Sequence, residues 1–331
     1  MVRQINPYLY SIPVDLPGSP LKNLNSYVFK GKKRNLLVDT GFNRPECLAS
    51  LKAGISELGL DMDKTDIFIT HCHADHCGLA PEIASPAASV YMSAVDKAIV
   101  NQYTGQGEAY WEKLDQTYVR EGFPEEEMAV ARRLNPARRF IPSRNFASRD
   151  MADGDKIALD DFIFTCVSTP GHTPGHMCLY DEKARIMLTG DHVLFDITPN
   201  ITVWEGLPDA LAGYLASLRK IRDCPVDLAL AAHRESRQDL APRVDELLRH
   251  HQARLQDAWE IVRAHGRVNA YQAAARMKWN IRARGWDDFP LGQKRFAVGE
   301  ALSHLNHLVY LGKLGKKPEN GINYYTNKEI A

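Results

Sequence analysis

The chain has 331 residues, 44% of them hydrophobic and 25% charged, an ordinary globular composition with enough apolar material for a core. Its 41 basic and 41 acidic side chains balance, so bulk charge gives no reason to expect nucleic acid or an anionic membrane as a partner. The sequence has no signal-peptide pattern and no apolar window long enough to span a membrane, and its six scattered cysteines form no disulfide framework, so we expect a cytoplasmic protein.

Short apolar runs separated by turn residues predict a sheet in the N-terminal part of the chain. The expected strands are residues 8–12, 26–29, 34–39, 67–70 and 89–92. Between the third and the fourth strand, residues 44–58 place leucine and isoleucine at helical spacing, which predicts a helix.

Residues 95–150 differ, because helix-forming and charged stretches replace the strands. We interpret this segment as a helical insertion that covers the functional site. Its aromatic side chains could line an acyl or aromatic pocket while its arginines hold a carboxylate. Alternatively, the aromatics form the insertion's own core and the arginines a solvated face, which is usual for arginine. The residues are Tyr103, Tyr110, Trp111, Tyr118 and Phe123, then Arg132, Arg133, Arg138, Arg139, Arg144 and Arg149.

Strand patterns return at residues 156–159, 162–167, 177–180, 185–188 and 226–231, with a helix expected at 209–221. This alternation predicts an α/β domain. The remainder is mostly helical, with amphipathic helices expected at 243–264, 268–278 and 293–311. Residues 313–326 carry the Gly-Lys and Asn-Gly pairs of a hairpin.

The C-terminal residues 243–331 contain 15 basic and 9 acidic side chains, a net charge of +6. Such an excess could serve nucleic-acid binding. No dense basic stripe is present, however, so we favour packing on the rest of the protein or a homodimer contact. His304 and His307, on the last predicted helix, are expected at an interface rather than at a metal.

One segment gathers four potential metal ligands within six residues. Thr70-His71-Cys72-His73-Ala74-Asp75-His76 directly follows a predicted buried strand. The strand end fixes the first histidine, and the turn after it aims the others inward. Imidazole and carboxylate groups are ligands that zinc, iron and manganese accept. A chance cluster of surface histidines is a poor explanation for this spacing, so the segment predicts a metal site.

Three later segments each place a histidine or an aspartate just past a predicted strand. Residues 168–176 carry His172 and His176, residues 188–192 carry Asp191 and His192, and residues 231–233 end in His233. Sheets of α/β proteins present functional groups at the carboxyl ends of their strands. We therefore expect ligands from these segments to complete the site.

Together these segments resemble the metallo-β-lactamase superfamily, whose members carry His-x-His-x-Asp-His, then a histidine, a bridging aspartate and a final histidine. Residues 36–41, LLVDTG, also resemble an early strand and turn of that family. The TPGHTPGH and TGD motifs resemble its glyoxalase II-like branch. The resemblance covers roughly residues 8–240 apart from the insertion. It implies an αββα sandwich in residues 1–241, with the insertion at about 95–150, and a winged-helix-like domain in residues 242–331.

The resemblance also implies two divalent metal ions. One would be bound by His71, His73 and His172 and the other by Asp75, His76 and His233, with Asp191 as the bridge; Ala232 departs from the family's usual glycine before the last histidine. Asp39 would accept a hydrogen bond that orients a ligand histidine. Zinc is the favoured metal, and iron or manganese would also suit these ligands. We expect His176, His192, Cys72 and Cys77 outside the ligand set.

The expected activity is hydrolysis of an ester, thioester or lactone. A hydroxide bridging two metals would be the nucleophile, and Asp75 or Asp191 could accept the proton of the water. The substrate would be a small acyl or aromatic molecule with a negative charge. The absence of a Gly-x-Ser-x-Gly elbow argues against a serine hydrolase.

Three alternatives stay open. The same site could cleave phosphodiesters, as in a ribonuclease, or hold a single iron at the three histidines, as in a persulfide dioxygenase. In a third alternative the chain is a DNA-binding regulator with a vestigial metal site. The intact set of ligands argues against the third.

Overall fold

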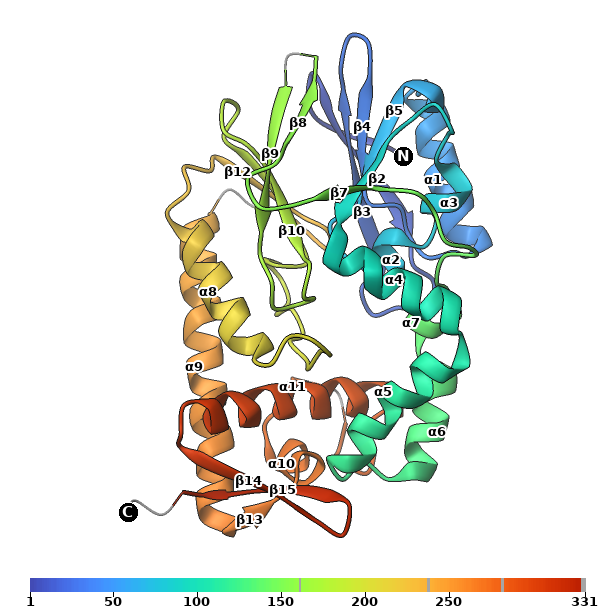
Figure 1. Ribbon diagram of the computed structural model, residues 1–331. Helices are drawn as coiled ribbons and strands as arrows, with labels where there is room; N and C mark the ends of the chain where they lie inside the picture. Colours follow the sequence, from blue (N-terminus) through green and yellow to red (C-terminus); the bar gives the residue numbers. More distant parts are fainter. Residues whose placement is uncertain (161, 237–238, 281–282, 329–331) are drawn as a thin grey trace.

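The computed structural model describes residues 1–160, 162–236, 239–280 and 283–328. In this part of the chain two sheets face each other, with helices on their outer sides (Figure 1). The first sheet runs antiparallel from β1 to β4 and parallel from β4 to β7. Its strands lie in chain order: β1 (Arg3–Asn6), β2 (Leu9–Asp15), β3 (Asn23–Lys30), β4 (Asn35–Val38), β5 (Thr65–Phe68), β6 (Val90–Ser93) and β7 (Arg149–Met151).

The second sheet has the strand order β12-β11-β10-β9-β8. The pair β11 and β12 is parallel, and the other pairs are antiparallel. Its strands are β8 (Lys156–Leu159), β9 (Phe162–Ser168), β10 (Met177–Asp181), β11 (Ile186–Gly190) and β12 (Leu228–Ala231).

An apolar layer fills the space between the sheets, because alternate side chains of each strand point inward. Leu9, Phe29 and Phe68 of the first sheet and Phe164 and Leu188 of the second are buried in it. Helix α1 (Pro45–Glu57) packs on the first sheet at β2, and α8 (Ala210–Arg222) packs on the other side of the molecule with the long helix α9 (Leu240–His265). The predicted α/β sandwich is therefore confirmed.

The structure corrects three details of the predicted sheets. Strand β1 was not expected, because its sequence RQIN shows no alternation of apolar and polar residues. Strand β5 ends at Phe68 rather than at residue 70, because the backbone N–H of Thr70 donates to the Asp39 side chain. The insertion was predicted to extend to residue 150, but Arg149 begins β7, a mostly exposed edge strand of the first sheet.

The insertion is helical, as predicted, and consists of α4 (Ala94–Gln106), α5 (Glu108–Arg120), α6 (Glu125–Leu134) and α7 (Pro136–Arg139). Tyr103 and Trp111 are buried in the core beneath the first sheet. Tyr118 and Phe123 are buried in the core that includes the C-terminal helices. These four aromatics therefore belong to hydrophobic cores, and Tyr110 is half-buried.

Several arginines of the insertion pair with carboxylates of the chain. Arg132 contacts Asp115 at 2.5 Å, and Arg138 contacts Glu108. Arg144 contacts Glu82 at 3.2 Å. Burial and ion pairing thus favour a structural role for these side chains over the lining of a pocket.

Below the sandwich in Figure 1, the C-terminal part contains a small sheet at its lower edge, with the strand order β13-β15-β14. Asn320 and Gly321 have φ of 49° and 82°, as a type I′ hairpin turn requires, so the predicted hairpin is confirmed. The winged-helix-like assignment stays a prediction, and residues 281–282 and 329–331 lie outside the described residues. The elements after α9 are β13 (Arg267–Val268), α10 (Ala270–Arg276), α11 (Leu291–Tyr310), β14 (Leu314–Glu319) and β15 (Ile322–Asn327).

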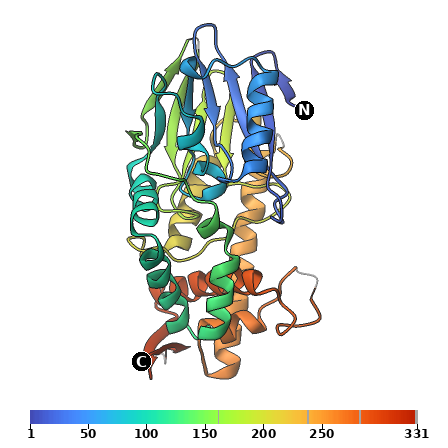
Figure 2. The ribbon, with the colours of Figure 1, turned by 90° about the vertical axis from the view of Figure 1, so that its right-hand side faces the viewer.

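The C-terminal part shares one apolar core with the sandwich. Met187 of β11, Tyr214 of α8, Leu247 of α9 and Leu302 of α11 belong to the same buried cluster. Helix α9 runs along the sandwich and continues into the C-terminal part (Figure 2). This arrangement agrees with the predicted packing on the rest of the protein. No helix in the described ranges combines the length and the apolar character that a membrane crossing needs.

Candidate metal centre

The segment after β5 carries four of the predicted side chains. His71 lies in the loop directly after the strand, and His73 precedes the short helix α2 (Ala74–Cys77), on which Asp75 and His76 stand. His71 and His76 are fully buried, Asp75 is 8% exposed, and His73 is half-buried. The first sheet thus delivers these side chains at the carboxyl end of one of its parallel strands.

The second sheet delivers the other three. His172 lies in the loop between β9 and β10, Asp191 follows β11 directly, and His233 lies two residues after β12. All three are buried. Gly190, just before Asp191, has a φ of 50°, and a Cβ there would come within 2.7 Å of the His176 ring. Glycine therefore allows the close approach that brings Asp191 to the centre.

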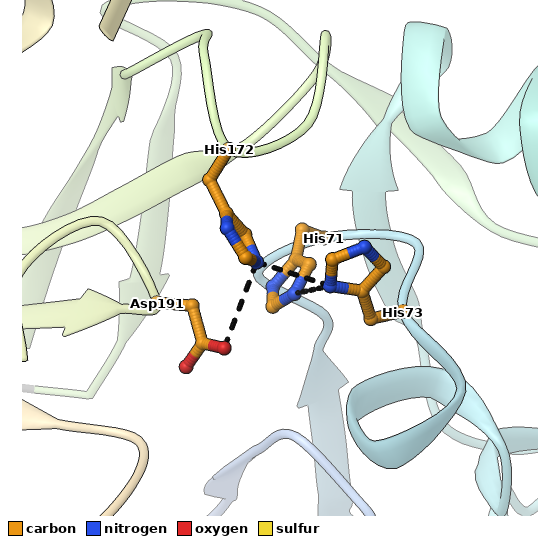
Figure 3. A group of neighbouring side chains, drawn as sticks. All are labelled: His71, His73, His172 and Asp191. Carbon is orange, nitrogen blue, oxygen red and sulfur yellow. Dashed lines mark hydrogen bonds and ion pairs between the residues drawn. The ribbon is translucent and has the colours of Figure 1, made fainter. Parts of the chain in front are cut away.

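Three histidines converge in the first group, shown in Figure 3. The Nδ1 atom of His73 lies 3.0 Å from Nε2 of His71 and 3.0 Å from Nε2 of His172. Three imidazole nitrogens at such separations suit one tetrahedral metal ion with an open fourth position. These are the ligands predicted for one metal.

Asp75, His76 and His233 form the second group. Nε2 of His233 lies 3.4 Å from Oδ2 of Asp75. All three residues are buried, so two nitrogens and a carboxylate face one another away from bulk water. These are the residues predicted for the second metal.

Asp191 lies between the two groups. Its Oδ2 is 3.6 Å from Nε2 of His172, in the first group. Its Oδ1 is 3.7 Å from Nε2 of His76 and 3.5 Å from Nε2 of His233, in the second. One oxygen of the carboxylate thus faces each group, as a bridging ligand requires.

Hydrogen bonds on the far side of the rings fix which nitrogen faces the centre. Nδ1–H of His172 donates to the carbonyl of Asn200 at 2.9 Å, and Nδ1–H of His233 donates to the carbonyl of Asn23 at 2.9 Å. Nδ1 of His76 contacts Oδ2 of Asp39 at 2.7 Å, the hydrogen bond predicted for that aspartate. Each bond leaves Nε2 with a free lone pair for a metal.

Thr70 extends this support to His71. Its hydroxyl donates to Oδ2 of Asp39 at 2.8 Å, and its backbone N–H donates to Oδ1 at 2.8 Å. Because its single proton goes to the carboxylate, the hydroxyl accepts from Nδ1 of His71 at 3.0 Å. Asp39 has a φ of 61°, a conformation that aspartate tolerates better than most residues. One buried aspartate therefore orients histidines of both groups.

Orphaned polar atoms test whether the residues fit metal ions. Among the described residues, Nε2 of His76, Nε2 of His233 and Oδ1 of Asp191 are buried without a hydrogen-bond partner. Buried polar atoms without partners are costly and rare in proteins. Oδ1 of Asp191 lies 3.7 Å from Nε2 of His76 and 3.5 Å from Nε2 of His233, so one divalent cation between them would satisfy all three atoms. The donor set therefore fits metal binding.

The pKa shifts of the side chains at the centre also support metal binding. Burial would lower the pKa values of His76 and His233, but neighbouring carboxylates raise both above the ordinary value. Against the effect of burial, the histidines hold the pKa of Asp191 well below its ordinary value and lower that of Asp75 to about 2. Burial lowers the pKa of His73 to about 3. The carboxylates of Asp75, in the second group, and of Asp191, between the groups, are therefore charged and available to a cation.

Four nearby residues lie outside the two groups. His176 accepts from the backbone N–H of Asp191 at 3.2 Å, so its other nitrogen donates to the hydroxyl of Thr169 at 2.8 Å. The ring of His192 lies against Tyr214, with centroids 5.0 Å apart. Burial raises the pKa values of the Cys72 and Cys77 thiols, which are therefore poor metal ligands in this setting.

Sequence reasoning missed Asp96, a fully buried carboxylate at the start of α4. It accepts from the backbone N–H of Cys72 at 2.9 Å, from the hydroxyl of Thr173 at 2.6 Å and from the backbone N–H of Gly175 at 2.6 Å. Asp96 thus ties the first ligand loop to the loop of His172. No local pattern in the sequence marks it.

Trp204 was missed as well. Its ring lies 5.8 Å from the ring of the half-buried His73, and its indole N–H donates to the carbonyl of His172 at 2.9 Å. It sits in the segment between β11 and α8, for which no local motif was found. The structure thus places an aromatic side chain beside the first group.

Comparison of the sequence with known proteins identifies its family. Residues 21–233 match the model of the Metallo-beta-lactamase superfamily. The Beta-lactamase-like protein 2 homolog of Caenorhabditis elegans is 24% identical over 280 residues, which are 83% of this chain and 79% of the worm protein. An Atrochrysone carboxyl ACP thioesterase of Aspergillus fumigatus is 23% identical over 232 residues, but these are only 42% of the fungal protein.

A similar structure is known by crystallography. A metallo-beta-lactamase family protein of Thermus thermophilus superposes with a TM-score of 0.83 and 27% sequence identity. The superposition covers 98% of this chain and 100% of the other. The arrangement of sandwich, insertion and C-terminal part therefore recurs as a whole.

Proposed function

The chain belongs to the metallo-β-lactamase superfamily, and from this premise we propose that it is a hydrolase with two divalent metal ions. We propose further that it cleaves an ester, thioester or lactone of a small molecule. The position of Asp191 carries the proposal, because its two oxygens face two separate sets of ligands.

Each ion has its own ligands in the proposal. His71, His73 and His172 hold the first ion. Asp75 and His76, together with His233, would hold the second, and Asp191, which faces both groups, would be shared by the two ions. Zinc is the favoured metal because imidazole and carboxylate in tetrahedral sets suit it, while iron and manganese are the alternatives.

Two metal ions bound by these residues would supply a hydroxide nucleophile at neutral pH and a Lewis acid for the substrate carbonyl. The carboxylates of Asp75 and Asp191 are the groups that hold the proton of the water. Both are ionised at neutral pH, because the histidines lower their pKa values against the effect of burial. Trp204 lies beside His73, with the ring centroids 5.8 Å apart.

Among the candidate bonds, a thioester is the first to test, because one similar fungal protein is named an ACP thioesterase. The TPGHTPGH motif supports placement in the glyoxalase II-like branch. Phosphodiester cleavage stays the alternative, since the same ligands suit it. A mononuclear iron site is less favoured, because the second group has a complete set of its own. The cytoplasmic location, homodimer contact and winged-helix-like domain remain predictions.

Metal analysis and substrate assays test the proposal. Protein purified in the presence of zinc should hold close to two ions per chain, and a chelator should abolish activity on a panel of thioesters, esters and lactones. A matched panel of phosphodiesters tests the alternative. A metal content near zero, or hydrolysis that a chelator leaves unchanged, contradicts the proposal.

A further inference from the structure

We propose that the C-terminal part supports the metal centre, because α11 fixes the orientation of His172 through Asn200. Asn200 and Glu300 would then be positioning residues for one of the two metals. The inference rests on the proposed metal centre, and it assigns to the C-terminal part a role in metal affinity.

The first link joins the ligand to the segment between β11 and α8. Nδ1–H of His172 donates to the backbone carbonyl of Asn200 at 2.9 Å. In the same segment, the indole of Trp204 donates to the backbone carbonyl of His172 at 2.9 Å. The segment therefore holds both the ring and the backbone of this ligand, so that a shift of the segment would turn Nε2 away from His73.

The second link joins that segment to α11. The side-chain amide of Asn200 donates to the carbonyl of Phe296 at 3.2 Å and to Oε2 of Glu300 at 3.4 Å. Both acceptors belong to α11. A single residue thus uses its backbone to orient a ligand and its side chain to hold the C-terminal helix.

The third link fixes Glu300 itself. Its Oε1 lies 3.2 Å from Nε of Arg254 on α9, and the two side chains are 12% and 9% exposed. Arg254 also donates to the carbonyl of Lys278 at 2.8 Å, and its guanidinium lies 4.1 Å from the Trp279 ring centroid. The largely buried ion pair therefore holds Glu300 in one position, as hydrogen-bonded buried pairs do.

Helix α11 also packs closely against the segment between β11 and α8 at a second place. The hydroxyls of Thr202 and of Tyr118, on α5, lie 3.0 Å apart. A Cβ at Gly299 would come within 2.5 Å of Oγ1 of Thr202 and 2.8 Å of the Tyr118 hydroxyl. Gly299 therefore lets α11 approach the segment closely, next to the position of Glu300.

The second metal group is supported from elsewhere. His233 donates to the carbonyl of Asn23, which begins β3, and His76 contacts Asp39, which follows β4. These partners lie in or directly after strands of the first sheet rather than in the C-terminal part. Loosening α11 should therefore weaken one metal much more than the other.

The experiment measures the two zinc dissociation constants of the full chain by competition with a chromophoric chelator. In Asn200→Ala the first-group constant should weaken by about 10- to 100-fold, as is typical for loss of an outer support, while the second stays within about twofold. Glu300→Gln keeps an acceptor for Asn200 but loses the charge that pairs with Arg254, so its effect should have the same direction and be smaller. The matched control is Asn306→Ala, which removes contacts to Lys316 and Tyr325 in the C-terminal part without touching Asn200.

Cobalt substitution adds a readout that general destabilisation would not change in this way. The visible spectrum of the first-group cobalt should shift in Asn200→Ala and stay that of the wild type in Asn306→Ala. Equal weakening of both metals, an unchanged first-group constant, or the same loss in the control overturns the inference. A wild-type protein that binds no zinc would instead overturn the proposed function, so the two failures are distinguishable.

Discussion

Asp39 and His76 are joined by a hydrogen bond of 2.7 Å between Oδ2 and Nδ1, and both side chains are almost completely buried. The same carboxylate holds Thr70, which in turn holds His71. Asp39 thus fixes one histidine of each metal group without facing the centre itself. Its negative charge also favours a cation on the other side of the His76 ring.

Replacing Asp39 should therefore weaken metal binding more than it destabilises the fold. In Asp39→Asn the shape is kept but the charge and one acceptor oxygen are lost. We expect zinc affinity at the second group to fall by about 10- to 100-fold, as for other losses of outer support. Chelator competition measures it. The control is Asp61→Asn, because the exposed Asp61 side chain caps a short 3-10 helix (Met62–Lys64) and pairs with Lys64 rather than with a ligand histidine. Equal loss in both variants would contradict the prediction.

Asp96 should be more important for stability. Asp96→Asn loses the charge that three donors from two loops contact, and bonds to charged groups contribute about 1.5–3 kcal/mol each. We expect the free energy of unfolding of the zinc-free protein to fall by at least about 2 kcal/mol, measured with denaturant. Ser93→Ala removes only the cap that Ser93 provides to the Asp96 backbone and serves as the control. A larger loss in that control would locate the effect in helix capping.

Substitutions of Trp111 and Tyr110 can distinguish the two interpretations of the insertion's aromatic side chains, which are a hydrophobic core and the lining of a pocket. Trp111 is 7% exposed and packs in the core, whereas Tyr110 is half-buried. Trp111→Ala should cost about 3–5 kcal/mol of stability, as is usual for a buried aromatic, with metal content unchanged. Tyr110→Ala should cost clearly less. If the Trp111→Ala protein instead kept the stability of the wild type and preferred different substrates, the result would favour the interpretation that these aromatics line a substrate pocket.

The contact between Asp209 and His307 predicts a dependence of stability on pH. The Asp209 side chain caps α8 and lies 2.7 Å from Nδ1 of His307 on α11. Burial alone would raise the pKa of Asp209, but the hydrogen bonds from His307 and the helix N-terminus lower it. A carboxyl group whose pKa is lower in the folded state stabilises the fold above its ordinary pKa, and this contribution is lost as the pH falls through the folded value.

Asp209→Ala should therefore reduce the free energy of unfolding by about 1 kcal/mol at pH 7, the usual cost of losing a cap. The difference from the wild type should shrink as the pH falls below about 4, where the carboxyl group begins to be protonated. Denaturant unfolding at several pH values measures both. Asp223→Ala, at the exposed other end of α8, is the control. A difference that stays constant down to about pH 3, below the ordinary pKa of aspartate, would contradict the prediction.

The sequence predicted the ligand cluster well, because its residues follow strands directly and form short local motifs. His71, Asp191 and His233 could be found one segment at a time, each from its own neighbours in the chain. Asp96 and Asn200 could not, because their partners lie far from them in the sequence. Their importance follows from how the helices of the insertion and of the C-terminal part pack, which no local pattern encodes.

Prediction of the strands from the sequence was limited in the same way, because it detects local patterns only. Strands with an apolar alternation, such as β8, were predicted to the residue. Edge strands β1 and β7 were missed because their exposed residues carry no such alternation, and only pairing with a neighbour makes them strands.

Four of the seven proposed ligands follow β5 of the first sheet, and the other three follow strands of the second. Two bound ions would therefore cross-link the first sheet to the second. Removing them would leave buried carboxylates facing one another with no countercharge except protons. On heating, the metal-free protein should then open first where the ligand loops of the two sheets meet. Backbone amides in the loops after β5 and β11 should therefore exchange hydrogen faster in the metal-free protein, at temperatures below global unfolding.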